Sequence, residues 1–290
     1  SDFSKLARLS YEKYGFFLLK EVLDEEKVFQ FREAFDQLFS EPGDSRLRFL
    51  RQTKSNSNLR RKISKGFLIN QLNNTLASIF HENEISLLPP FNIAQNYLPH
   101  SILTRGSGWH RDVGGELKIK KCRELISREN YIFGKIGIYF QKNSDYGGAI
   151  DLIPGTNNDF LTNSFSKFKV ILVIKFLIFF QNYIPWIYKK ITRSSLLSNL
   201  LGSISLKIDA GDVVIFDSRI FHKGTFASEE VENKLTYNTA KLQAELPFDK
   251  TKYVLYSHFG NSVGSKSYFL DRLNRQGNEN ESQQWVDDTI

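Results

Sequence analysis

The sequence predicts a mainly β fold with flanking helices, an α+β class whose core is a sandwich or a jelly-roll barrel. Apolar residues recur at helical spacing in the first 90 residues, whereas from Phe91 onward they alternate with polar residues, as in half-buried strands. Clusters of Gly and Pro separate the alternating segments at short intervals, which is typical of all-β domains. These observations favour a β core that follows a helical N-terminal part.

The 290 residues fit one domain, which we divide into three parts. Residues 1–90 should form an N-terminal helical or lid part, and residues 91–260 the jelly-roll core with an insertion at about 157–208. Residues 261–290 should form a C-terminal helix and a polar tail. A hydrophobic fraction of 41%, with 25 Phe and 12 Tyr, is sufficient for a sizeable aromatic core.

The N-terminal part should begin with a short strand at 14–19 and continue with two helices. Asp24 is a suitable N-cap for the first helix. Apolar residues then follow at helical spacing, namely Val28, Phe31, Phe35, Leu38 and Phe39. Pro42 and Gly43 should end this helix, and a second amphipathic helix should span about 67–82.

The core should contain several short strands, bounded by turn residues. We expect them at 91–97, around His110, at 135–140, at 149–153, at 213–216, from Tyr237 onward and at 253–256. Pro154-Gly155-Thr156-Asn157 is a strong turn signal, and Ala210-Gly211-Asp212 introduces the strand that leads to His222.

The charge balance favours an anionic partner. The net charge is +7 and the isoelectric point is about 9.2, which suits a phosphate-bearing or carboxylate substrate, a membrane surface or nucleic acid. Many cations lie between Arg46 and Lys65, in a Ser- and Asn-rich stretch that predicts either an exposed or mobile connection or a lid that faces the substrate. Because no nucleic-acid-binding motif or interleaved aromatic residues accompany them, we expect no nucleic acid partner.

Cysteine usage indicates the redox setting. The single Cys122 excludes an intramolecular disulfide, and no charged segment followed by an apolar segment begins the chain. We therefore expect a reducing, cytoplasmic setting.

Two histidines and one aspartate have the pattern of an iron site. His110 and Asp112 are two residues apart, so on a strand their side chains would face the same side, and His222 follows about a hundred residues later. Two imidazoles and one carboxylate form the facial set that holds non-heme Fe(II) and leaves positions open for a co-substrate and dioxygen. The remaining histidines, His81, His100 and His258, we interpret as structural.

Three ordered blocks carry a family resemblance over about residues 12–260. They are Trp109-His110-Arg111-Asp112, Gly147-Gly148-Ala149-Ile150-Asp151-Leu152-Ile153-Pro154-Gly155-Thr156, and Gly211-Asp212-Val213-Val214-Ile215-Phe216 followed by His222. The order and spacing of these blocks resemble the phytanoyl-CoA hydroxylase-like family of Fe(II)- and 2-oxoglutarate-dependent dioxygenases. The resemblance implies a double-stranded β-helix, the cupin-like jelly-roll, with flanking helices. It also implies His110, Asp112 and His222 as catalytic iron ligands, with 2-oxoglutarate and dioxygen as co-substrates.

The resemblance also implies a basic residue that binds the distal carboxylate of 2-oxoglutarate. In relatives this is typically an Arg about a dozen positions after the second His, where this chain has Lys234, with Thr236 on the same strand face as a further donor. A Lys binds a carboxylate as a point charge and lacks the bidentate fork of Arg. Because halogenating relatives replace the carboxylate ligand with a small residue and Asp112 is present, the resemblance favours hydroxylation.

The insertion contains an unusually apolar block. Val170–Phe180 is apolar except for Lys175, and cations lie on both sides of it, namely Lys167, Lys169, Lys189, Lys190 and Arg193. Trp186 and Tyr188 are typical of a membrane boundary. Three alternatives remain open: membrane contact at the interface through 167–193, a helix buried against the barrel or in an oligomer interface, and, least favoured, a membrane span.

Together these features predict an Fe(II)- and 2-oxoglutarate-dependent oxygenase. It should hydroxylate a small or amphiphilic anionic substrate, such as a lipid-linked sugar or an acyl compound, peripherally at the inner face of a membrane. The alternative from another class is a non-catalytic metal- or ligand-binding jelly-roll protein. Production of succinate from 2-oxoglutarate distinguishes the two.

Overall fold

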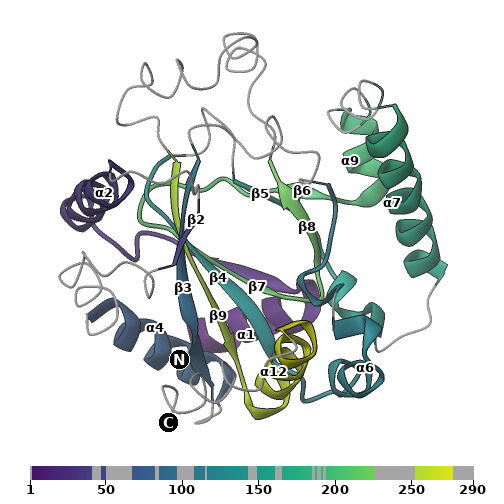
Figure 1. Ribbon diagram of the computed structural model, residues 1–290, viewed down its shortest axis with the longest axis horizontal. Coiled ribbons are helices and arrows are strands. Elements are labelled where there is room, and N and C mark those ends of the chain that lie inside the picture. Colours follow the sequence, from purple (N-terminus) through teal and green to yellow (C-terminus); the bar gives the residue numbers. More distant parts are fainter. Residues whose placement is uncertain are drawn as a thin grey trace.

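The structure is a computed structural model that describes residues 2–40, 47–49, 67–81, 85–96, 108–114, 116–142, 149–160, 165–184, 187, 191, 194–225 and 252–276. Its described strands form two antiparallel sheets (Figure 1). The large sheet has the order β1 (Phe16–Leu19), β7 (Val213–Asp217), β4 (Phe133–Tyr139), β9 (Lys252–Gly260), β3 (Ser86–Asn96) and β2 (Leu47–Phe49). The small sheet has the order β6 (Ile204–Ser205), β5 (Ile150–Ile153) and β8 (Phe221–Gly224).

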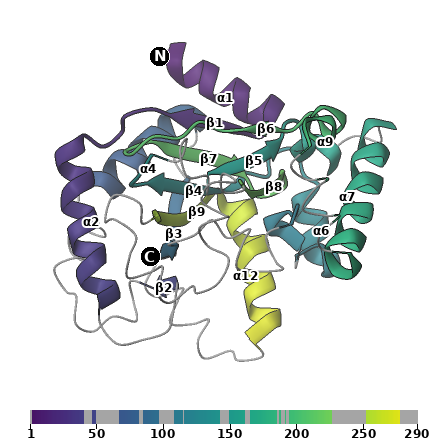
Figure 2. The ribbon, with the colours of Figure 1, turned by 90° about the horizontal axis from the view of Figure 1, so that it is seen from above.

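Helices surround the two sheets (Figures 1 and 2). They are α1 (Asp2–Tyr14), α2 (Glu25–Ser40), α4 (Phe67–Phe80), α6 (Lys120–Ile126), α7 (Phe165–Tyr183), α9 (Ser195–Leu201) and α12 (Ser262–Gln276). Short 3-10 helices occupy Asp112–Gly114, Glu116–Lys118 and Thr156–Phe160. The chain is therefore a mixture of antiparallel sheets and flanking helices, as the sequence predicts.

The central strands of the large sheet are buried on both faces. On the outer face, Ile136, Ile215 and Leu255 pack with buried residues of α1, α2 and α4 in one cluster. On the inner face, Val214 and Val254 pack with Leu152 of the small sheet in another cluster. Burial on both sides explains why β4 and β7 are almost continuously apolar instead of alternating.

The first helices and the strand between them have a clear local basis. Asp24 caps α2 as predicted, because its Oδ1 accepts a hydrogen bond of 2.8 Å from the backbone N–H of Lys27. The second predicted helix corresponds to α4. The expected strand at 14–19 starts only at Phe16, because α1 continues through Tyr14 and Gly15 turns the chain with a φ of +84°.

Two further strands differ from the expectation. Leu47–Phe49, within the basic stretch expected to be an exposed or mobile connection, pairs with β3 as an edge strand, and most of that stretch lies outside the described residues. β3 begins at Ser86 instead of Phe91, and its register with β9 shifts between Leu88 and Asn92. Pro89 and Pro90 lie in that shift, where they cannot donate a backbone hydrogen bond. The strand expected from Tyr237 onward lies outside the described residues.

The insertion covers the outer face of the small sheet. Val170, Ile174 and Leu177 of α7 pack with Leu197 and Leu201 of α9 in a cluster that also contains Trp109, Ile153 and Phe221. The alternative of a helix packed on the β core is therefore confirmed for one face of α7. Within the described part of the chain, no helix combines the length and apolarity that crossing a bilayer requires.

Candidate metal centre

A single β-bridge brings the two predicted histidines together. The backbone N–H of His110 donates to the carbonyl of His222 at 3.0 Å, and the reverse bond is 2.9 Å. The backbone N–H of Asp112 donates to the carbonyl of Ser218 at 3.0 Å, and Asp112 begins a 3-10 helix. The expectation of an extended strand carrying both His110 and Asp112 was therefore wrong: a one-residue bridge followed by a tight turn places both side chains beside His222.

The hydrogen bonds of the two imidazoles fix their orientation. Nδ1 of His110 donates to the carbonyl of Gly108 at 2.8 Å, and Nδ1 of His222 donates to the carbonyl of Ile220 at 3.1 Å, since a carbonyl can only accept. Each ring therefore keeps its Nε2 lone pair available. Bonds of this kind orient histidine ligands in metal sites.

The free ligand atoms converge on Asp112. Nε2 of His110 lies 3.9 Å from Oδ1 of Asp112, and Nε2 of His222 lies 3.7 Å from Oδ2. One ligand atom from each of the three residues lies within 4.8 Å of the others. The His222 side chain is 7% exposed and that of His110 is 50% exposed, so the site opens to solvent on the side of His110. Two oriented imidazoles and one carboxylate suit a divalent transition metal.

Lys135 of β4 is a charged neighbour that the sequence did not single out. Its Nζ lies 3.0 Å from Oδ2 of Asp112, and its side chain is 23% exposed. A lone cation in the apolar strand Phe133–Tyr139 was the signal that could have revealed it. Burial raises the pKa of Asp112, but attraction from Lys135 and the two imidazoles outweighs burial and holds that pKa well below its usual value. Burial lowers the pKa of His222 to about 4, so at neutral pH both groups are in the protonation state that binds metal.

The turn between β7 and β8 positions Asp112 through a backbone hydrogen bond to Ser218. Arg219 contacts the Asp217 carboxylate with two nitrogens, Nε at 3.0 Å and Nη2 at 2.6 Å, and both side chains are buried. Ser218 lies between them, accepts from Asp112 through its carbonyl, and donates from Oγ to the carbonyl of Phe133 at 3.0 Å. This buried ion pair was not predicted from the sequence to be part of the site.

A second buried ion pair supports the strand that carries His222. Nζ of Lys223 lies 2.7 Å from Asp151 across the β5–β8 pairing, on the face of the small sheet opposite His222. Asp151 also accepts hydrogen bonds from Ser205 at 2.5 Å and Thr225 at 2.8 Å. These partners satisfy the buried carboxylate and fix the register next to His222.

The other predicted residues divide into three groups. Arg111 donates to the carbonyl of Thr156 at 2.9 Å and so faces away from the three candidate ligands. His81 lies exposed after the end of α4, and His258 stacks on Phe133 with ring centroids 5.6 Å apart. His100, Lys234 and Thr236, together with Trp186 and Tyr188, lie outside the described residues, so their roles remain predictions.

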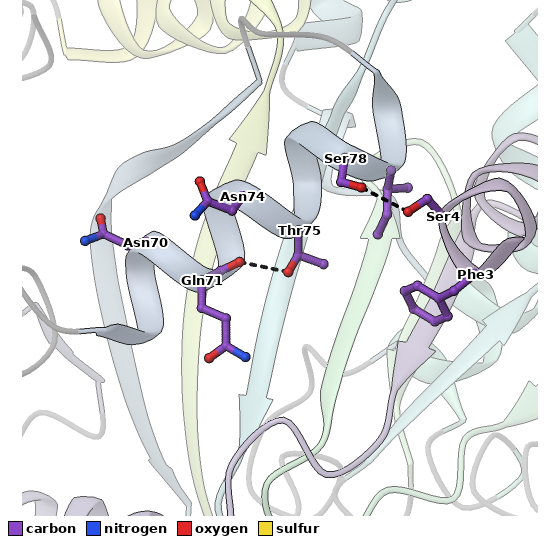
Figure 3. A pocket seen from close by; sticks show the side chains of 8 residues that line it. Phe3, Ser4, Asn70, Gln71, Asn74, Thr75 and Ser78 are labelled. Carbon is purple, nitrogen blue, oxygen red and sulfur yellow. Dashed lines mark hydrogen bonds between the residues drawn. The ribbon is translucent and has the colours of Figure 1, made fainter. Parts of the chain in front are cut away.

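A groove on the opposite side of the large sheet offers no comparable chemistry. It has a volume of about 570 Å³ and lies between α1 and α4 (Figure 3). Its described lining consists of amide, hydroxyl and apolar side chains, among them Ser4, Asn74 and Ser78, and no His, Cys or carboxylate is among these described residues. Because α1 and α4 cover the outer face of the large sheet, the groove is separated from the metal centre by that sheet.

Comparison with known proteins identifies the family. The model of the phytanoyl-CoA dioxygenase family (PhyH) matches residues 11–227, which include all three metal-centre residues. The chain belongs to the phytanoyl-CoA dioxygenase family. Enzymes of the phytanoyl-CoA dioxygenase type use Fe(II), 2-oxoglutarate and dioxygen, and the two oriented imidazoles and the carboxylate of this chain fit the iron. No curated protein matches the chain in sequence.

Solved structures share the fold of this chain. The non-heme α-ketoglutarate-dependent epimerase SnoN from nogalamycin biosynthesis has a TM-score of 0.53 at 10% identity, with 90% of this chain and 84% of that chain covered. EctD from S. alaskensis, solved with 2-oxoglutarate and 5-hydroxyectoine, has a TM-score of 0.51 at 10% identity, with 89% of this chain and 76% of that chain covered. At these identities the likeness is one of fold.

Proposed function

We propose that this chain is an Fe(II)- and 2-oxoglutarate-dependent oxygenase that hydroxylates a small or amphiphilic anionic substrate. The observation that carries the proposal is the orientation of His110 and His222, whose Nδ1 atoms bind backbone carbonyls while their Nε2 atoms face Asp112. In this interpretation the two sheets are the halves of a double-stranded β-helix, the cupin-like jelly-roll. Its interior between β4 and β8 then holds the reacting molecules.

His110, Asp112 and His222 would hold the iron, which supplies the coupling of oxidative decarboxylation of 2-oxoglutarate to oxidation of the substrate. The chain itself binds and orients the reacting molecules and excludes water. Phe216, whose ring centroid lies 4.9 Å from that of His222, provides an apolar wall beside the centre. The half-exposed His110 side leaves a route by which substrate enters.

Lys135 is our candidate for binding the anionic co-substrate beside the iron. Its ammonium now neutralises Asp112 at 3.0 Å. If Fe(II) also binds the Asp112 carboxylate, the positive charges of the iron and of Lys135 together exceed the one negative charge of Asp112. A carboxylate of 2-oxoglutarate would compensate this excess. Lys234 and Thr236 keep their predicted role at the distal carboxylate. 2-Oxoglutarate has two carboxylates, so both lysines have a partner.

The two lysine assignments are tested by anaerobic titration of 2-oxoglutarate into Fe(II)-loaded protein. Lys135→Met and Lys234→Ala should each weaken binding roughly ten- to a hundredfold, because each removes a charge-assisted contact of ~1.5–3 kcal/mol. The exposed Lys118→Met is the matched control and should bind like the wild type. Unchanged affinity in Lys135→Met would restrict Lys135 to orienting Asp112, and unchanged affinity in Lys234→Ala would move the distal role to another cation.

The reaction type is tested with isotopically labelled dioxygen and candidate anionic substrates, lipid-linked sugars and acyl compounds first. Hydroxylation incorporates one labelled oxygen atom into the product. Loss of two hydrogens, or an isomer of unchanged mass, would instead indicate desaturation or epimerisation. Binding of Fe(II) and 2-oxoglutarate without succinate would support the rival, a non-catalytic binding protein.

A further inference from the structure

Helix α7 forms an outer layer of the molecule on the side of the small sheet (Figures 1 and 2). Val170, Ile174 and Leu177 point towards the barrel and are buried, in the cluster that contains Trp109 and Ile153. A helix that only packs on a domain carries polar residues on its other face. α7 does not follow this rule.

The face of α7 that points away from the barrel is apolar and aromatic. Leu172 is 43% exposed, Phe176 57%, Phe179 51% and Tyr183 73%. At 3.6 residues per turn these four positions fall within about 60° of one another and roughly opposite the buried row. The rings of Phe179 and Tyr183 contact each other with centroids 4.9 Å apart. We call Leu172, Phe176, Phe179 and Tyr183 the outer stripe.

Cations border the outer stripe. Lys169 and Lys175 are exposed and fall on its two sides around the helix. The whole sequence from Phe160 to Ile208 contains seven Lys or Arg residues and no Asp or Glu, although the chain as a whole contains 32 acidic residues. An apolar row between cations, without any acidic residue in the surrounding segment, is complementary to a surface that is both apolar and anionic.

We propose that the outer stripe of α7 docks parallel to an anionic membrane surface, with Lys169 and Lys175 at the lipid headgroups. A second copy of this chain is a poorer occupant, because a symmetric contact would place these lysines against the same cationic segment. The adjoining helix α9 also exposes apolar side chains, with Leu196 at 75% and Leu200 at 44%. α7 lies in the interface in this arrangement and does not cross the bilayer.

Docking has a geometric consequence for the metal centre. The buried row of α7 packs in one cluster with Trp109 and Phe221, the residues that precede His110 and His222. One helix layer, about 10 Å, therefore separates the membrane from the strand that carries His222. The idea that the substrate is presented by the membrane rests on the proposed oxygenase function. The docking of α7 on the membrane requires neither iron nor catalytic turnover.

The test is co-sedimentation of the full chain with vesicles of phosphatidylcholine, with and without phosphatidylglycerol, in low and high salt. The wild type should pellet with the anionic vesicles, and salt should weaken the binding. Phe176→Gln with Phe179→Gln should weaken it by at least about tenfold, since two half-exposed rings lose their apolar insertion. Lys169→Gln with Lys175→Gln should weaken it by roughly fivefold per lysine.

The matched control is Leu6→Gln with Leu9→Gln on α1, where the side chains are 67% and 50% exposed. α1 packs with α4 on the large sheet, whereas α7 packs on the small sheet. This variant should bind like the wild type. Ile174 and Leu177 are not suitable positions, because both are buried against the barrel and their replacement would disturb folding.

Absence of wild-type binding to anionic vesicles, or equal loss in the α1 control, would overturn the proposal. A wild type that self-associates and becomes monomeric only in the Phe176→Gln, Phe179→Gln variant would also overturn it, in favour of a contact between copies. The vesicle assay contains neither iron nor 2-oxoglutarate. A negative result therefore contradicts the membrane docking without bearing on the proposed oxygenase activity.

Discussion

Replacing Arg219 with Met should destabilise the protein strongly, although Arg219 is not one of the three candidate metal ligands. The guanidinium is bound to the Asp217 carboxylate, and the two side chains are 6% and 0% exposed. Arg219→Met leaves that carboxylate buried without its countercharge, which costs about 3–5 kcal/mol. The lost contact of Nη1 with the carbonyl of Ile126, 3.3 Å in the native state, adds to this cost.

The assay is urea denaturation of the wild type, Arg219→Met, Asp217→Asn and the double variant. The double variant should lose less stability than Arg219→Met alone, because no unpaired charge remains buried. Arg8→Met is the control: it breaks an ion pair with Glu12 whose side chains are 40% and 53% exposed, and a hydrogen bond of 3.0 Å from Nη1 to the carbonyl of Phe80. It should cost at most about 2 kcal/mol. A loss below 1 kcal/mol in Arg219→Met, or a double variant no better than that single one, would refute the reasoning.

The same variant tests how the turn supports the metal centre. Ser218, between Asp217 and Arg219, accepts the backbone N–H of Asp112 and so fixes the carboxylate ligand. Loss of such supporting contacts typically lowers metal affinity ten- to a hundredfold. Titration of Fe(II) under anaerobic conditions should show this loss in Arg219→Met and not in Arg8→Met. Equal affinities in the two variants would mean that the turn supports folding only.

Three further predictions concern packing, backbone conformation and the metal. Phe35→Ala should cost about 3–5 kcal/mol of unfolding free energy in urea denaturation, because the ring is fully buried against Phe140 at a centroid distance of 5.0 Å; a cost below 2 kcal/mol would contradict the packing. Gly211→Ala should cost about 2–5 kcal/mol of unfolding free energy, because φ is +88° and a Cβ would lie 2.2 Å from the carbonyl oxygen of Leu23. Gly202→Ala should cost only about 1–2 kcal/mol, because φ is +64° and a Cβ there would meet open space. Equal losses of unfolding free energy in the two variants would refute this reasoning. His222→Ala should abolish Fe(II) binding in an anaerobic titration while the chain stays folded by circular dichroism, and retained affinity would remove His222 from the ligand set.

The sequence predicted the elements whose pattern depends on large apolar residues. α2 and the core strands are examples, because Phe35 and the run Val213–Phe216 are strongly stabilised by burial in the hydrophobic core. α1 was missed for a physical reason. Its buried residues are Ser4, Ala7 and Tyr11, whereas Phe3, Leu6 and Leu9 are exposed, so its apolar periodicity does not mark the face that packs.

α7 illustrates a second limit. It is apolar on both faces, so the hydrophobic period does not show whether Ile174 or Phe176 faces the small sheet. Only the packing in the structure distinguishes the two residues. In the candidate metal centre, the order His-x-Asp and a distant His predicted three residues that the structure brings together. The one-residue bridge, the tight turn at Asp112 and the approach of Lys135 depend on tertiary contacts between β4, β7 and β8, which no local pattern encodes.

The most direct test of the central claim measures succinate formed from 2-oxoglutarate by the wild type, with and without Fe(II), and by His110→Ala, Asp112→Ala and His222→Ala. We predict Fe(II)-dependent succinate in the wild type and background levels in all three variants. Near-wild-type succinate in any variant would contradict the assignment of that ligand. No succinate from a wild type that binds both Fe(II) and 2-oxoglutarate would contradict the oxygenase function itself.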